Sequence, residues 1–486
     1  MSKTALYLIY FCIYSVALLI IGKGSLGGGS STKDYFTCER KVGLPLCVCT
    51  FVGTWVSAIT ILSLTGSVYE DGLAVLFYSV IPWFLGAFLL ALVTKRLYAH
   101  DVVTVPELFR IRYDSRALQV TYGVIFILVY IFYLVAQYKG FGMVASAVFD
   151  IPYPVAVGMV YLFIMYTTFG GYRSVVRTDM FNLTLLIVSL TVICLSIVSK
   201  VGGLEDLYAL AREVEGYAHA ASEAPTQKGQ LLSLFGGRYT PLTSLSMFWG
   251  WGLGLAANPQ YVIRLLSAKN ERTALRTIFC SLTLLTFLYF LLVHIGLGMR
   301  VLVPTSPSVS NTDGIIIHII NHELYGSWSG FFLFSVIGAC ISTANSQLLL
   351  IASSLSYDVV RSVSRRELSE KQVVSLARAG VLFGGTLAML LTLDPPAFTL
   401  SYGGDIWGII SILFFPPLFG TLLTHKLTRK GIWACILVGV TAIALLYPMY
   451  YRGTLEAHPA MFGTPLSAAA MFLVSALDRR REGPTP

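Results

Sequence analysis

The chain has 486 residues, of which 56% are hydrophobic and only 12% charged, and its formal net charge is +9 at pH 7. A soluble protein of this size carries roughly twice that charged fraction, so the composition excludes an ordinary soluble domain. Apolar runs of about 20 residues, the length that crosses a bilayer as a helix, recur along the whole chain. We therefore interpret the basic excess as charge on loops beside membrane lipid, and we expect no nucleic-acid partner.

The apolar runs predict an all-α polytopic membrane protein with thirteen transmembrane helices, in a single domain that covers residues 1–486. The expected spans are 4–22, 46–69, 74–94, 120–147, 153–171, 178–200, 242–263, 275–300, 328–357, 373–393, 401–423, 431–448 and 460–478. The first run has no small-residue cleavage site, so we expect a retained helix and not a signal peptide. The eight cysteines lie in or near the spans and indicate neither a disulfide framework nor a zinc site.

Basic residues are concentrated in one alternate set of loops. Most of the 34 lysines and arginines lie there, for example in 95–116 and 361–371. Because basic loops stay cytoplasmic, we expect a cell-membrane protein with its N-terminus outside and its C-terminus inside. Residues 201–241 then form an extracellular loop that begins with a short surface helix. Residues 301–327 contain "DGIIIHIINHEL", which is too short to span and predicts either a lid over an outer vestibule or a packed connecting helix.

Two spans carry signs of interruption at their centres. The second span contains "GTWVSAIT" and the seventh contains "WGWGLGLAANPQ", in which glycines crowd the middle and Asn258 precedes Pro259. The two spans are five apart, which is the offset expected for inverted repeats of five helices over 46–200 and 242–423. Close helix packing through small residues is the alternative for each span taken alone.

The stretch "GACISTANSQ" places polar residues within an otherwise apolar span. Ala339, Ser342, Thr343 and Ser346 share one helical face. Hydroxyl oxygens and helix carbonyls suit Na⁺, and a broken helix opposite would supply further freed carbonyls. The alternative is that these hydroxyls bond back to carbonyls of their own helix.

Four stretches together resemble the sodium/solute symporter family, which includes proline, pantothenate, monocarboxylate, sialic acid and sugar symporters. They are "KDYFTCERKVG", "FGGYRSVVRTDMFN", "NPQYVIRLLSAKNERTALR" and "ISTANSQLLLIASSLSYDVV", and Asn182 stands in the second where the family usually has glutamine. The resemblance implies a LeuT-like five-plus-five inverted repeat with one extra N-terminal and two extra C-terminal helices. It also implies sodium-coupled symport of a small organic solute by a protein that functions as a monomer.

The resemblance further implies a sodium ion between the first and eighth core helices. The implied ligands are the carbonyls of Gly53, Val56 and Ala339 and the hydroxyls of Ser342 and Thr343. Asp179 is the family's acidic residue near this site. Some members bind a second sodium with this aspartate and further hydroxyls; here Ser346 is available, and Asn345 stands where another hydroxyl would serve.

The solute is expected near the break in the second span. The expected lining is Thr54, Trp55 and Ser57, with Trp249, Trp251 and Asn258 opposite and Tyr402 from the eleventh span. Gln137 and Lys139 lie in the middle of the fourth span. A lysine at membrane depth is costly, so Lys139 indicates an anionic solute unless it snorkels to the outer surface. This favours a monocarboxylate or pantothenate over a sugar, with proline open as well.

Other classes of function have weaker support. A channel would need a continuous polar stripe, whereas the polar clusters are confined to mid-span segments. A solute-sensing membrane receptor is a further alternative. An enzyme is not expected, because the spans contain no paired aspartates, Ser-His pair or HExxH motif.

Overall fold

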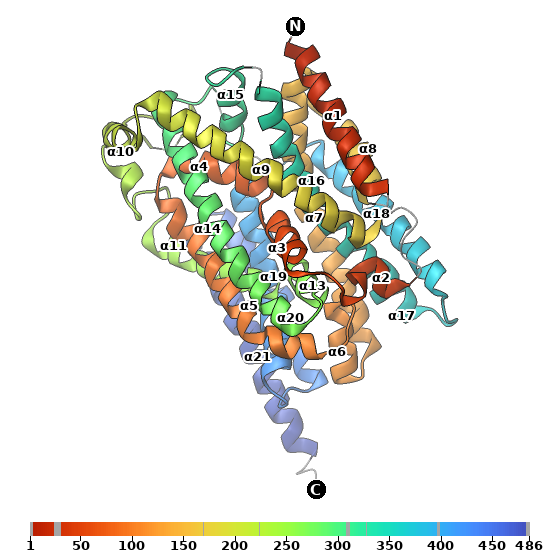
Figure 1. The fold of residues 1–486 in the computed structure, drawn as a ribbon. Helices are drawn as coiled ribbons and strands as arrows, with labels where there is room; N and C mark the ends of the chain where they lie inside the picture. Colours follow the sequence, from red (N-terminus) through yellow and green to blue (C-terminus); the bar gives the residue numbers. More distant parts are fainter. Residues whose placement is uncertain are drawn as a thin grey trace.

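The computed structural model describes residues 3–23, 31–168, 170–222, 224–307, 312–326, 328–395 and 399–482. Within these ranges the chain is helical, with two isolated β-bridges and no strand. The helix α1 begins at the top of Figure 1 and α21 ends at its bottom, so the first and last helices reach opposite ends of the bundle.

The first half of the bundle runs from α1 to α9. Its helices are α1 Lys3–Lys23, α2 Thr32–Thr37, α3 Leu44–Trp55, α4 Leu64–Asp71, α5 Ile81–Ala99, α6 Val105–Tyr113, α7 Arg116–Phe149, α8 Tyr153–Thr168 and α9 Gly171–Val201. Short segments of other helical type accompany them: the 3₁₀ turn η1 Cys38–Arg40 and the π-helical η2 Ile59–Ser63 and η3 Leu76–Val80.

The second half runs from α10 to α21. Its helices are α10 Leu204–Glu213, α11 Pro241–Met247, α12 Leu253–Ala257, α13 Pro259–Leu266, α14 Glu271–Leu302, α15 Ile315–Asn321, α16 Ser329–Ser353, α17 Arg361–Val363, α18 Glu370–Thr392, α19 Thr399–Leu423, α20 Arg429–Tyr451 and α21 Ala460–Glu482. The 3₁₀ turn η4 Gln230–Leu232 and the π-helical η5 Phe248–Gly252 and η6 Ser354–Val360 complete the set.

Helices occupy every predicted span. By length and apolar composition, ten of the described helices are able to cross a membrane, or eleven when the bent pair α3 and η2–α4 is taken as one span. The helix α8 and the short helices α11 to α13 fall below that measure, so the count of thirteen stays a prediction. The bend of 61° between α3 and η2–α4 confirms that the second span is broken.

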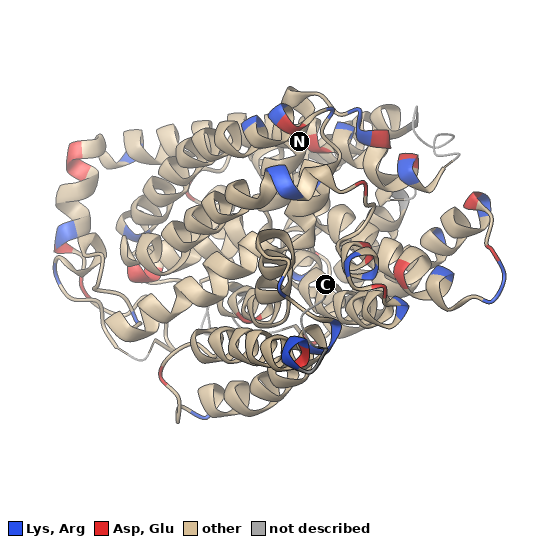
Figure 2. Ribbon diagram, turned by 90° about the horizontal axis from the view of Figure 1, so that it is seen from below, with Lys and Arg blue, Asp and Glu red and all other residues tan. Residues whose placement is uncertain are grey.

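Charged side chains lie mainly at helix ends and loops, and the helix bodies are largely uncharged (Figure 2). The two long loops predicted outside contain α10 and α15, which lie toward the end at which α1 begins (Figure 1). The five isoleucines of α15 are buried, so this segment is a packed connecting helix.

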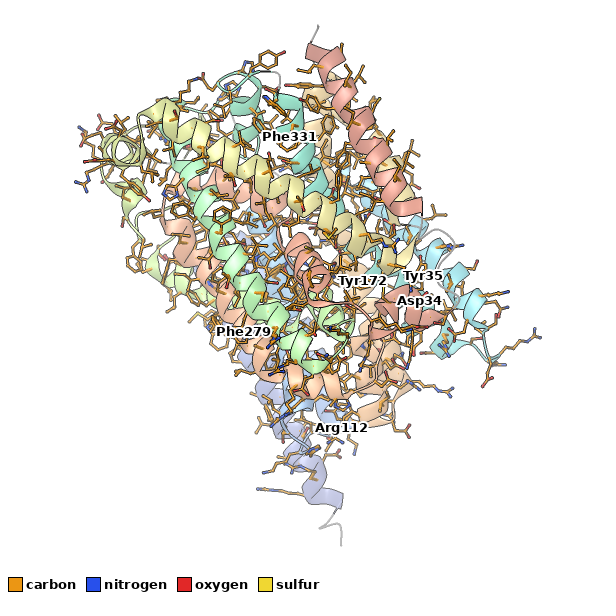
Figure 3. All side chains as sticks on the ribbon, viewed as in Figure 1. Asp34, Tyr35, Arg112, Tyr172, Phe279 and Phe331 are labelled. Atoms are coloured by element: carbon orange, nitrogen blue, oxygen red, sulfur yellow. The ribbon has the colours of Figure 1, made fainter. Side chains whose placement is uncertain are left out.

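The helix α2 was not predicted and packs against the start of α9. Ser31 caps α2, and Asp34 accepts a 2.8 Å bond from Arg173 at the beginning of α9. Figure 3 shows Asp34 and Tyr35 beside Tyr172 at this corner of the bundle. Tyr172 in turn contacts Ser267 after α13, with 3.1 Å between the two hydroxyl oxygens. This corner therefore connects the first-half and second-half helices at one end of the molecule.

Candidate functional site

The second span is broken between α3 and η2. Val56, the residue after α3, has an extended backbone with φ −81° and ψ 98°. In a continuous helix the amide of Ala58 would donate to the carbonyl of Thr54, but here it donates to Oε1 of Gln137 at 3.1 Å. The break therefore frees the Thr54 carbonyl for bonds from other helices, and Gln137 of α7 lies directly at the break.

Thr343 of α16 reaches this break from the opposite side. Its hydroxyl lies 3.3 Å from the carbonyl oxygen of Thr54 and 3.5 Å from that of Gly53. Ser342 beside it accepts a 3.2 Å bond from Nδ2 of Asn182 in α9. Both predicted hydroxyls thus face other helices instead of bonding back along α16. Ala339 is buried one turn earlier on the same helix.

Asp179 of α9 borders the same junction of α3, α9 and α16. Its Oδ2 accepts a 2.5 Å bond from the Thr50 hydroxyl, and a Cβ added to Gly53 would lie 3.4 Å from the Asp179 Cβ. The carboxylate is fully buried, and its Oδ1 has no hydrogen-bond partner in the described part of the chain. Buried polar atoms are rarely left in this state. The candidate ligands at this junction are the Asp179 carboxylate, the Ser342 and Thr343 hydroxyls and the freed carbonyls of the break. All of these are oxygens, which hard cations prefer, so they fit a sodium ion.

Arg264 of α13 supplies a buried positive charge beside this junction. Its guanidinium donates to the carbonyl of Thr50 at 3.0 Å, to the carbonyl of Gln260 at 2.5 Å and to the hydroxyl of Ser346. Thr50 therefore bonds Asp179 through its side chain and Arg264 through its backbone. The two opposite charges are held on either side of one residue, which offsets part of the cost of burying each.

The structure separates the three residues expected at a second sodium. Ser346 accepts from Arg264 and donates to the carbonyl of Ser342 at 2.8 Å. Asn345 faces α8, where its Oδ1 accepts bonds of 2.9 and 2.8 Å from the hydroxyls of Thr167 and Thr168. Asn345 therefore does not lie beside Asp179, because one residue's step along α16 turns its side chain toward a different helix.

The seventh span is also broken, and its break contacts the first one. Asn258 has an extended backbone and caps α13, with Oδ1 accepting from the Gln260 amide at 3.0 Å and from the Tyr130 hydroxyl at 2.6 Å. Nε2 of Gln260 then donates to the freed carbonyl of Thr54 at 3.3 Å. The two interrupted segments predicted from the sequence are therefore in direct contact.

An aromatic cavity adjoins the two breaks. Its lining is Trp55, Ser57, Ile59, Thr60, Trp83, Tyr133, Trp251 and Trp407. Trp251 packs edge-to-face on Trp83 and Trp407, with ring centroids 5.0 and 5.1 Å apart. Trp55 is held in place by a 2.8 Å bond from its indole nitrogen to the Tyr289 hydroxyl. The lining carries no charged side chain, and the space between the rings is about 10 Å³, room for about one water molecule. A solute with an apolar body would match these walls once they move apart.

Polar atoms without protein partners border the breaks next to this cavity. They are Thr54 Oγ1, Gln137 Nε2 and Asn258 Nδ2, each buried and without a hydrogen-bond partner in the described residues. Native proteins satisfy such atoms with water or ligand. Hydroxyl and amide donors beside aromatic walls are the arrangement typical of small-solute pockets.

Of the nine predicted lining residues, only Trp55, Ser57 and Trp251 line this cavity. Thr54, Gln137 and Asn258 lie at the helix breaks, and Trp249, Tyr402 and Lys139 lie elsewhere. Tyr402 donates its hydroxyl to the carbonyl of Phe132 at 2.7 Å and joins α19 to α7. Trp249 is only half-buried and is absent from the cavity lining. Neither residue borders the cavity, because a residue's place in a span does not fix the direction in which its helix face points.

Lys139 is not an open partner for an anionic solute. Its Nζ lies 2.8 Å from Oδ2 of Asp313, and both side chains are buried. Asp313 lies just before α15, in the loop predicted outside the membrane. The loop brings this acid to Lys139 because it folds back between helices. There, a Cβ added to Gly66 of α4 would meet the Thr312 carbonyl oxygen at 2.5 Å.

Several residues of the site were missed by the sequence reasoning. They are Thr50, Trp83, Tyr133, Asn182 as a hydrogen-bond donor, Gln260, Arg264 and Trp407. Arg264 had the clearest signal, since an arginine six residues after a helix-breaking Asn-Pro pair falls near membrane depth. The aromatic residues had none, because tryptophan and tyrosine are common throughout the spans.

Known proteins resemble this chain over nearly its whole length. Residues 35–439 match the sequence model of the sodium:solute symporter family. The osmoregulated proline transporter OpuE of Bacillus subtilis is 24% identical, covering 96% of this chain and 94% of its own length. Sodium/proline symporter 2 of Staphylococcus saprophyticus is 25% identical, with 90% and 85% covered.

Solved structures show the same fold at lower identity. A Na⁺-coupled sialic acid symporter in a substrate-bound outward-open state superposes with a TM-score of 0.76 at 18% identity, covering 97% of this chain and 98% of its own. MHP1, a nucleobase-cation-symport-1 family transporter, gives 0.55 at 14% identity, with 94% and 96% covered.

Proposed function

The chain belongs to the sodium:solute symporter family and is a sodium-coupled membrane transporter of a small organic solute. We propose that this solute is a zwitterionic amino acid, with proline as the best fit. The observation that carries the proposal is the uncharged aromatic cavity beside two helix breaks. The apolar ring of proline can pack against the tryptophan walls. Its charged amino and carboxylate groups can bond the backbone groups freed by the breaks and the polar atoms that have no partner there.

The solute class follows from the charges as well as from the cavity. A monocarboxylate or pantothenate would call for a basic side chain, but Lys139 is paired with Asp313, and Arg264 bonds two carbonyls and Ser346. The two curated relatives named above are proline transporters, which supports the same choice.

In the proposed cycle, sodium and solute bind at the two sides of the α3–η2 break. Sodium would be held by the Gly53 and Thr54 carbonyls, Ser342, Thr343 and Asp179, with Val56 and Ala339 adjoining. Because the same short segment borders the solute cavity, each ligand stabilises the backbone conformation that the other requires, which is the condition for coupling. An inside-negative potential of about 100 mV adds roughly 2.3 kcal/mol for each inward sodium charge.

We further propose one transporter unit with two inverted repeats, 46–200 and 242–423. It would act as a monomer in the cell membrane with its N-terminus outside. The placement of α2, α6 and α17 at the end opposite the start of α1 supports this orientation (Figure 1), because the adjacent loops are those rich in basic residues.

Proteoliposomes with an inward sodium gradient should accumulate labelled proline above its equilibrium level, and collapse of the gradient should release it. Lactate, acetate, pantothenate and glucose should not accumulate, because the cavity offers no free basic group for an anion and few hydroxyl partners for a sugar. Empty liposomes are the control. Accumulation of lactate or pantothenate without proline would overturn the zwitterion proposal, and sodium-independent accumulation would overturn the coupling scheme.

A single sodium per solute is the second expectation. Ser346 is engaged by Arg264 and Asn345 by α8, which leaves one oxygen-rich position. Paired measurements of labelled sodium and proline entry should give a flux ratio of about one, and the Asn345→Ser variant should keep that ratio although it adds a hydroxyl. A ratio of two in the unmodified protein would contradict this expectation.

A further inference from the structure

His458 lies outside the ten-helix region, in the segment between α20 and α21, yet its side chain is deeply buried. Its backbone amide donates to the hydroxyl of Ser246 in α11 at 2.7 Å. The Thr243 hydroxyl likewise donates to the carbonyl of Glu456 at 3.1 Å. The segment is therefore fastened to the outer part of the broken seventh span.

The imidazole of His458 occupies the space left by two glycines. A Cβ added to Gly250 of η5 would meet Cε1 of His458 at 2.8 Å and Nδ1 at 3.0 Å, and a Cβ added to Gly408 of α19 would also collide with the ring. Each glycine is the direct neighbour of a pocket tryptophan, Gly250 of Trp251 and Gly408 of Trp407. One imidazole therefore supports the backbone behind both walls of the aromatic cavity.

The orientation of this imidazole is determined by its hydrogen bonds. Nδ1 accepts from the amide of Ala460 at 3.3 Å, and Nε2 lies 3.5 Å from Oδ1 of Asp405, close to it but without a hydrogen bond. Asp405 of α19 is itself held by the Tyr451 hydroxyl, and its carbonyl accepts a 2.8 Å bond from Tyr447. Both tyrosines belong to α20, so the two appended helices and α19 form one polar cluster around the ring.

We propose that His458 is a positioning residue for the solute pocket, which sets the separation of Trp251 and Trp407 through Gly250 and Gly408. The inference rests on the proposed function only in taking these tryptophans as the walls that contact solute. It gives the α20–α21 segment a part in solute affinity, without any direct contact between His458 and solute or sodium.

His458→Ala should raise the KM for proline at least fivefold, leave the maximal rate within twofold, and leave the sodium concentration for half-maximal uptake unchanged. The reason is that the pocket walls lose their support while the sodium ligands are untouched. His458→Gln should restore the KM to within twofold, because its amide can donate to Asp405.

His294→Ala is the matched control, since that buried imidazole of α14 bonds Tyr208 and Phe290 and is not part of the cavity lining. An unchanged KM in His458→Ala, or an equal rise in His294→Ala, would overturn the inference.

A second pair of variants covers the case in which His458→Ala folds poorly. Gly250→Ala should raise the KM for proline because its methyl group collides with the ring. In the double variant Gly250→Ala, His458→Ala this collision is absent, so its KM should be closer to that of the unmodified protein than the KM of either single variant. Additive effects would count against the inference.

Tryptophan fluorescence separates this inference from the proposed function. His458→Ala should shift the emission of the purified protein, His294→Ala should not, and replacing Trp251 and Trp407 with phenylalanine should abolish the shift. If the unmodified protein does not transport proline, the proposed function is wrong. The fluorescence measurement still tests whether His458 positions the two tryptophans. An emission spectrum unaffected by His458→Ala would refute it.

Discussion

Replacing Lys139 with methionine is expected to destabilise the protein by about 3–5 kcal/mol, the cost of leaving a buried charge without its partner. The partner is Asp313, whose Oδ2 lies 2.8 Å from the lysine Nζ. The double variant Lys139→Met, Asp313→Leu should recover most of this stability, because an apolar pair of similar volume is often as stable as a buried ion pair. Thermal unfolding of the detergent-solubilised unmodified protein and of these two variants compares their stability.

An exposed ion pair provides the matched control for this experiment. Lys228 and Glu213 lie 2.9 Å apart with both side chains largely exposed, so Lys228→Met should leave the unfolding temperature close to that of the unmodified protein, because solvent screens an exposed pair. The KM for proline in the double variant decides what Lys139 does. A KM near that of the unmodified protein agrees with a structural pair that docks the 312–326 segment. A large rise in KM that the double variant does not reverse would mean that Lys139 contacts the solute after all.

Replacing Thr343 with alanine is expected to raise the sodium concentration for half-maximal uptake by about 10-fold to 100-fold. One hydrogen bond or oxygen contact to a charged group is worth about 1.5–3 kcal/mol, and 1.4 kcal/mol corresponds to tenfold in affinity. The hydroxyl lies within 3.5 Å of both carbonyls that the break exposes, so its loss removes one oxygen and leaves the others in place. Ser342→Ala should act in the same direction.

Thr343→Ser should keep near-normal sodium dependence, because it retains the hydroxyl. Ser353→Ala is the control on the same helix: Ser353 is buried, but its hydroxyl bonds the carbonyl of Leu350 within α16 at 3.0 Å. Its sodium dependence should therefore match that of the unmodified protein. If Thr343→Ala and Ser342→Ala both keep normal sodium dependence, the proposed ion site is wrong, even where proline uptake itself is sodium-driven.

The sequence pattern predicted the features that depend only on residues close together in the chain, namely the spans, their breaks and the polar face of α16. Apolar runs of bilayer length gave spans that helices occupy, since a helix in lipid must satisfy its backbone internally. Glycine, asparagine and proline at the centres of the second and seventh spans predicted breaks, and the structure has breaks at Val56 and Asn258. The helical repeat placed Ser342 and Thr343 on one face of α16, and both hydroxyls do face other helices.

The tertiary structure alone decided which of these faces meet. Lys139 and Asp313 are 174 positions apart, and no spacing rule predicts that an outer loop folds back to a mid-span lysine. Asn345 and Ser346 are adjacent in sequence but bond different helices, because each residue turns 100° about the axis of α16. The aromatic cavity draws its walls from five stretches of the chain, and His458 supports two of them from a sixth. Such contacts depend on the rotation and packing of whole helices, which residue type and spacing leave undetermined.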